Sequence, residues 1–108
     1  MRTVVILNHD HMGHGDPQLG RRILATFLRK SPAMNHLDAI VLYNGGVKLI
    51  TEGSPVLADL HQLHEAGVDL LPCGTCLESI GLTPAIGHAS DMDAIIRELD
   101  RAEKVITL

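Results

Sequence analysis

The chain has 108 residues, the size of one domain, and its formal net charge of −4 without a run of Lys or Arg excludes a basic nucleic-acid footprint. Hydrophobic residues make up 45% of the sequence but aromatic residues only 2%, so the core must be aliphatic. No apolar run approaches the ~20 residues of a membrane span, and the first residues lack a signal-peptide pattern. We therefore expect a single domain over residues 1–108, in the cytoplasm, with no nucleic-acid or membrane partner.

The chain opens on a strand pattern, because residues 3–7 form a continuous apolar and β-branched run typical of a strand buried on both faces. A polar, histidine-rich loop follows over residues 8–15. An Asp-Pro pair at 16–17 predicts a helix start, and a Ser-Pro pair at 31–32 predicts its end. The side chains expected on one face of this helix are Leu19, Ile23, Leu24, Phe27 and Leu28.

A second buried-strand pattern covers residues 37–43 and ends in a glycine-rich turn. Residues 47–53 are expected to form a loop or a short extension. A Ser-Pro pair at 54–55 repeats the helix-start signal, and Gly67 is a suitable C-terminal cap for that helix. The side chains expected on its buried face are Val56, Leu57, Leu60 and Leu63.

The third strand pattern, residues 68–71, leads almost directly into the only two cysteines of the chain, Cys73 and Cys76. One or two helical turns follow and stop at Gly81. Residues 85–87 indicate a very short further strand, and residues 104–108 a final one. Between these two strands, Ser90 or Asp91 caps a last helix whose inward-facing residues are expected to be Met92, Ile95, Ile96 and Leu99.

Strands alternate with helices throughout, which predicts an α/β fold: a three-layer α/β/α arrangement with a mainly parallel sheet of about five strands. The carboxyl ends of parallel strands share one edge of the sheet, and ligands bind there. The loops expected at this edge hold both cysteines and four of the seven histidines. Outside the cysteines, the candidate ligand-binding residues in these loops are Asn8, Gly13, Gly15, Asn44, Gly45, Gly46, Gly74 and Thr75.

The two cysteines should lie where a strand ends and a helix begins, a position at which unpaired backbone N–H groups favour a thiolate. Four interpretations stay open: a persulfide carrier, a thioredoxin-like dithiol, half of a zinc site, or small apolar residues in a tight turn. The loop histidines that would complete the zinc site are His9, His11, His14 and His88. We expect no tightly held metal and no cofactor, because a second regular ligand pair is missing.

The two thiols are expected to differ. Cys73 should lie at or just before the first helical turn, while Cys76 should lie about one turn further in, with a less exposed sulfur. Lys48 is the only cation in the loops nearest the cysteines, so it is a candidate to stabilise a thiolate or an anionic cargo. Cys73, Cys76 and Lys48 are therefore the candidate catalytic residues.

Five blocks of sequence resemble a known family: Gly13-His14-Gly15-Asp16-Pro17-Gln18-Leu19-Gly20, Asn44-Gly45-Gly46-Val47-Lys48-Leu49, Glu52-Gly53-Ser54, Gly67-Val68 and Cys73-Gly74-Thr75-Cys76-Leu77. In this order they resemble the DsrE-like superfamily, and most closely the C-terminal domain of YedF-type proteins, which are described as sulfurtransferase-like and linked to selenium metabolism. The resemblance implies a three-layer α/β fold, assembly into oligomers, and a cysteine that relays persulfide sulfur between proteins.

The resemblance also suggests roles for single residues. In sulfur-relay relatives the reactive cysteine ends a strand, eight residues before a glycine, and Cys73 stands in that relation to Gly81. Cys76 is then a resolving or a structural thiol. The nearest relatives carry a TusA-like sulfur-carrier domain ahead of this one, so the partner here would be a separate protein. We expect a homo-oligomer, a trimer or its multiple, that carries sulfur or selenium as a persulfide or perselenide; the alternative is a non-catalytic oligomeric module that binds a small ligand or a metal.

Overall fold

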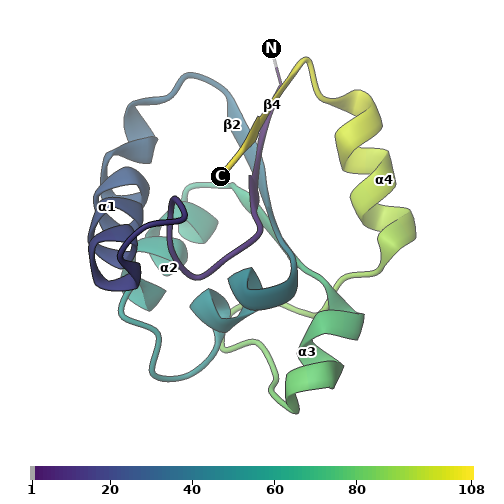
Figure 1. The fold of residues 1–108 in the computed structure, drawn as a ribbon. Helices are drawn as coiled ribbons and strands as arrows, with labels where there is room; N and C mark the ends of the chain where they lie inside the picture. Colours follow the sequence, from purple (N-terminus) through teal and green to yellow (C-terminus); the bar gives the residue numbers. More distant parts are fainter. Residues whose placement is uncertain (1) are drawn as a thin grey trace.

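The computed structural model describes residues 2–108. Within them, four parallel strands form one sheet in the order β3-β2-β1-β4, with β1 at Thr3–Leu7, β2 at Leu37–Leu42, β3 at Asp69–Pro72 and β4 at Lys104–Thr107. Helices α1 (Pro17–Lys30) and α2 (Leu57–Glu65) cover one face of the sheet, and α4 (Met92–Arg101) stands against the other (Figure 1). The predicted three-layer α/β architecture is therefore confirmed. In the described part of the chain, no helix is long and apolar enough to cross a membrane.

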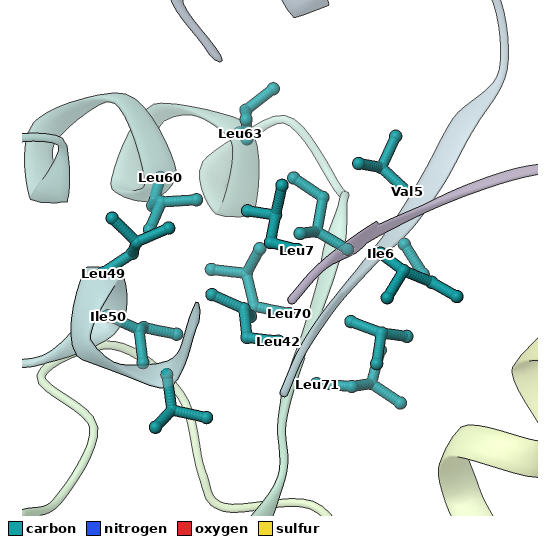
Figure 2. Close-up of a cluster of buried hydrophobic side chains, with 14 of the residues drawn as sticks. Val5, Ile6, Leu7, Leu42, Leu49, Ile50, Leu60, Leu63, Leu70 and Leu71 are labelled. Atoms are coloured by element: carbon teal, nitrogen blue, oxygen red, sulfur yellow. The ribbon is translucent and has the colours of Figure 1, made fainter. Parts of the chain in front are cut away.

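The core is aliphatic, as the composition predicts. The two central strands are buried on both faces, which is why their sequences are continuous apolar runs rather than alternating ones. On one face, side chains of three strands meet side chains of α2 and of the 3-10 helix η2 (Asn44–Ile50), as Figure 2 shows. These residues are Leu7, Leu42, Leu70, Leu49, Ile50 and Leu60. The hydrophobic effect of burying these side chains is the main contribution that keeps η2 packed against the carboxyl end of the sheet.

Of the two predicted helix starts, the one at residues 16–17 is confirmed and the one at residues 54–55 is displaced. The Asp16 side chain accepts the Gln18 N–H at 3.1 Å, so α1 begins at the predicted Asp-Pro pair. The second Ser-Pro pair gives a turn instead, in which the Ser54 hydroxyl oxygen accepts the Val56 N–H at 3.3 Å, and α2 begins only at Leu57. The expected loop over residues 47–53 is helical through Ile50, where η2 ends.

The expected strand over residues 85–87 is not present, and these residues are all described. The Ala85 N–H donates to the Ile50 carbonyl at 2.8 Å, so it is used by η2 rather than by a neighbouring strand. Gly87 has a φ of +68°, which turns the backbone out of the extended conformation. Ser90 alone forms an isolated parallel bridge, with Cys73, so this segment crosses the end of the sheet without widening it.

The expected inward faces of the first and last helices are only partly correct. Leu24, Leu28 and Ile95 are buried, and the partly buried Phe27 and Leu99 also pack against the core. Four other apolar residues of these faces point outward, and the exposed fractions are 51% for Leu19, 43% for Ile23, 51% for Met92 and 55% for Ile96. The apolar stripe of each helix is therefore wider than the strip that the sheet can cover.

Candidate thiol site

The carboxyl ends of the strands bring the predicted loops together. The Tyr43 N–H donates to the Leu7 carbonyl at 3.0 Å, which joins the exit of β2 to that of β1. The Cys73 N–H donates to the Leu42 carbonyl at 2.9 Å, which joins the exit of β3 to that of β2. The prediction that these loops share one edge is confirmed. Two segments follow strands at this edge: the histidine loop (residues 8–16) and the cysteine segment (residues 73–80), which contains α3 (Gly74–Ile80).

Cys73 is the N-cap of α3, and its sulfur accepts the Cys76 N–H at 3.4 Å. The segment that crosses the sheet end lies against it: the Ser90 N–H donates to the Pro72 carbonyl at 2.8 Å, and the Gly74 N–H donates to the Ser90 carbonyl at 2.9 Å. A Cβ on Gly74 would come within 2.8 Å of the Ser90 oxygen, so only glycine permits this approach. Cys73 is consequently buried, with 8% of its surface exposed.

Cys76 faces a pocket of about 500 Å³. Its sulfur accepts the Asn44 N–H at 3.1 Å, and Asn44 holds a left-handed φ of +47° at the start of η2. The pocket is lined by Tyr43, Asn44, Gly45, Lys48, Thr75, Cys76, Ser79 and Ile80. The expected order of exposure is therefore wrong: Cys73 is the covered thiol and Cys76 the more accessible one, because the Ser90 segment closes over Cys73.

The surroundings of Cys76 disfavour its ionised form. Burial raises the pKa of the Cys76 thiol, its hydrogen bond with Cys73 raises it further, and the Asn44 N–H acts in the opposite direction. Burial also raises the pKa of the Tyr43 hydroxyl, with a smaller contribution from negative charge on the two cysteines. The site therefore disfavours several negative charges at once, and a second ionisation next to an existing thiolate is costly.

Lys48 lies between the pocket and the histidine loop. It is exposed and lines the pocket, and its charge also helps to lower the pKa of Asp10. The largest cause of that lowering is the hydrogen bond between Asp10 and His11, whose atoms are 2.7 Å apart, and Arg21 adds to it. Lys48 is therefore the cation in the pocket lining that can interact with a bound anion, and the negative charge of Asp10 partly offsets its positive charge.

The histidine loop does not converge on the pocket. The His9 ring lies 5.6 Å from the His11 ring and 6.0 Å from the His14 ring, measured between centroids. Gly13 and Gly15 are exposed, with nothing within 4 Å of a Cβ built on either. Among residues 2–108, no group of three His, Cys, Asp or Glu side chains is placed to hold a metal ion.

Only some of the predicted site residues meet. Five of them line the pocket: Asn44, Gly45, Lys48, Thr75 and Cys76. Asn8 is partly buried and lies outside the pocket lining, with its N–H donating to the Leu108 carbonyl at 3.4 Å. Gly46 and Gly74 serve close backbone contacts instead, and a Cβ on Gly46 would overlap the Leu7 carbonyl oxygen.

The sequence interpretation missed three lining residues, Tyr43, Ser79 and Ile80. Ser79 and Ile80 follow Thr75 and Cys76 by four positions on α3, so they continue the same helix face. This four-residue spacing in the sequence was the signal that could have identified Ser79 and Ile80 as lining residues. The chemical roles of the individual thiols are not decided by their placement and stay predictions.

The fold and site define a class of protein: a parallel α/β domain with a thiol pair at the carboxyl edge of its sheet. The chain belongs to the DsrE/DsrF-like family, whose family model matches residues 1–108. No functionally curated protein matches the sequence.

Solved structures share the fold. The ychN protein from E. coli aligns over 100% of both chains with 19% identity and a TM-score of 0.68. The MTH1491 protein from Methanobacterium thermoautotrophicum, described as a protein of unknown function, aligns over 99% of this chain and 98% of its own, with 18% identity and a TM-score of 0.70. The BT1422 protein from Bacteroides thetaiotaomicron aligns over 98% and 94%, with 18% identity and a TM-score of 0.62. At these identities the likeness concerns the fold alone.

Proposed function

We propose that this protein carries sulfur as a persulfide on its cysteine pair, and that Cys76 is the thiol that meets the donor. The observation that carries the proposal is the placement of the Cys76 sulfur: it faces a pocket of about 500 Å³, accepts a backbone N–H, and shares the pocket lining with Lys48. Membership of the DsrE/DsrF-like family supports a function of the sulfur-relay type.

In the proposed uptake step, the Cys76 thiolate attacks the outer sulfur of a donor persulfide. The S–S bond of the donor breaks, the donor leaves as a thiolate that takes up a proton, and a persulfide forms on Cys76. An acceptor thiolate then attacks the outer sulfur of that persulfide, and Cys76 leaves as a thiolate. No net oxidation occurs in either step, so no redox cofactor is required.

The surroundings of Cys76 suit this exchange. The raised pKa keeps the resting sulfur protonated, and a thiol of higher pKa is the stronger nucleophile once it ionises. The Asn44 N–H and the Lys48 ammonium group offer stabilisation to a negative charge on either sulfur of the persulfide. Cys73 caps the first turn of α3, and its hydrogen bond with Cys76 helps to raise the pKa of the Cys76 thiol.

The finer relationships are part of the same proposal. The Cys73-Gly74-Thr75-Cys76-Leu77 block supports a place near the C-terminal domain of YedF-type proteins, and with it a selenium as well as a sulfur cargo. A TusA-like sulfur carrier, the kind of protein that the resemblance associates with this domain, is the partner that we propose.

The test is intact-mass analysis of the purified protein after exposure to glutathione persulfide. The wild-type chain should gain the mass of one sulfur atom and lose it again when excess low-molecular-weight thiol is added. The matched control is the Cys73→Ala/Cys76→Ala variant, which should gain nothing. A wild-type chain that gains no sulfur, or a double variant that gains as much, would show that the cysteines are not a carrier.

A further inference from the structure

A cavity of about 440 Å³ lies between α4 and β3, apart from the thiol pocket, with which it shares no lining residue. Its walls come from the end of α2, from β3, from residues 87–90 and from α4. The ionisable side chains that line it are His64, Asp69, His88, Arg97, Glu98 and Arg101. This cavity therefore gathers charged groups from four separate parts of the chain.

The buried carboxylate of this cavity is already paired within the protein. Glu98 is 4% exposed, and its Oε1 accepts a hydrogen bond from Nη2 of Arg2 at 2.8 Å. Its Oε2 accepts a hydrogen bond from Nη2 of Arg101. These charge-assisted bonds offset the charge of Glu98 and fix the guanidinium group of Arg101 at the cavity wall. Glu98 and Arg101 consequently need no ligand to balance their charges.

Arg97 and Asp69 are the charged lining residues that stay unpaired. Both side chains are exposed, and neither has an ion-pair partner within residues 2–108. Arg97 belongs to α4 and Asp69 begins β3, so the two charges come from different walls and do not pair with each other. A ligand with one negative and one positive group can contact both.

The rest of the lining is largely apolar. Leu70 and Leu71 are only 9% and 8% exposed, and Ala89 and Ala94 also line the cavity. An aliphatic group on a ligand gains free energy when it covers such side chains. The volume of about 440 Å³ is sufficient for a molecule the size of a free amino acid.

We propose that this cavity binds a free α-amino acid with an aliphatic side chain. The carboxylate of the ligand lies on Arg97, whose guanidinium group can donate two parallel hydrogen bonds to it. The ammonium group donates to the carboxylate of Asp69, and the aliphatic side chain packs against Leu70 and Leu71. The site is independent of the proposed sulfur transfer, because it uses neither cysteine.

The experiment is an NMR titration of the isotopically labelled full chain with L-leucine, which does not react with thiols. The backbone amide signals of Ser90 and Arg97 should shift and saturate, with a dissociation constant of about 1 mM. N-acetyl-L-leucine lacks the positive charge and L-leucinamide lacks the negative charge, so each should bind at least about tenfold more weakly than L-leucine.

Two variants test the assigned contacts. Arg97→Met and Asp69→Asn should each weaken the binding of L-leucine about tenfold. The matched controls are Arg22→Met and Asp93→Asn, which remove the same charges from exposed positions outside the cavity and should bind like the wild type.

The proposal is overturned if L-leucine causes no saturable shift at concentrations up to about 20 mM. It is also overturned if N-acetyl-L-leucine or L-leucinamide binds as tightly as L-leucine, since the site would then not require both charges. Wild-type affinity in either Arg97→Met or Asp69→Asn would likewise contradict the assigned contacts.

Discussion

The histidine loop and the cysteine segment both follow strands that end at the same edge of the sheet, but they are built differently. In the cysteine segment, backbone groups approach so closely that Gly74 admits no side chain beside Ser90. In the histidine loop, Gly13 and Gly15 have open space around them, and His14 is exposed. Packing therefore distinguishes the two segments: the cysteine segment holds a sulfur at a defined pocket, and the histidine loop is open to solvent.

The largest effect is expected where backbone packing is closest, at Gly46. A Cβ there would overlap the Leu7 carbonyl oxygen, a backbone atom of a buried strand that cannot move aside. Gly46→Ala should lower the free energy of unfolding by about 3 kcal/mol, measured by urea denaturation. The matched control is Gly15→Ala, which has nothing within 4 Å of the added carbon and should change stability by about 0.5 kcal/mol or less. Equal effects of the two substitutions would show that backbone packing is no closer at Gly46 than in the histidine loop.

That contrast was only partly predictable from the sequence. The buried strands and the start of α1 were predictable because continuous apolar runs and an Asp-Pro pair act locally. The burial of Cys73 was not, because it depends on the crossing of Ser90, a contact between distant residues with no local signal. The outward direction of Ile96 was not predictable either, since periodicity gives the position of an apolar stripe but not the width that the sheet covers.

A moderate effect is expected from Lys48, which connects the two segments. In a Cys73→Ala background, where only Cys76 reacts, Lys48→Met should lower the ratio of alkylation rates by iodoacetate and iodoacetamide about threefold, because only iodoacetate is an anion. Lys30→Met is the matched control, since Lys30 lines a hollow on α1 instead. An unchanged ratio in the Lys48 variant would show that this cation does not act on the pocket.

The smallest effect is expected in the histidine loop. The hydrogen bond with His11 and the charges of Arg21 and Lys48 hold the pKa of Asp10 below its usual value, with burial acting against them. Because the folded pKa is depressed, this stabilisation is present above the unfolded pKa of about 3.9 and disappears as the pH falls through the lower folded pKa. Asp10→Asn should therefore cost about 0.5 kcal/mol at neutral pH and nothing in strong acid.

Urea denaturation at several pH values measures this difference, with Asp69→Asn as the control for an exposed carboxylate at the start of β3. A cost of Asp10→Asn that persists unchanged in strong acid would mean that the carboxylate charge is not the cause.

The central proposal is that Cys76 is the thiol that meets the donor, and its most direct test is sulfur uptake by the two single variants, Cys73→Ala and Cys76→Ala. Both are treated with glutathione persulfide for the same short time and analysed by intact mass. The structure leads us to expect that Cys73→Ala, which keeps the thiol in the pocket, gains one sulfur atom at a rate close to that of the wild type, while Cys76→Ala gains little. Uptake by Cys76→Ala at the wild-type rate, with loss of uptake in Cys73→Ala, would contradict the account and assign the carrier role to the buried cysteine.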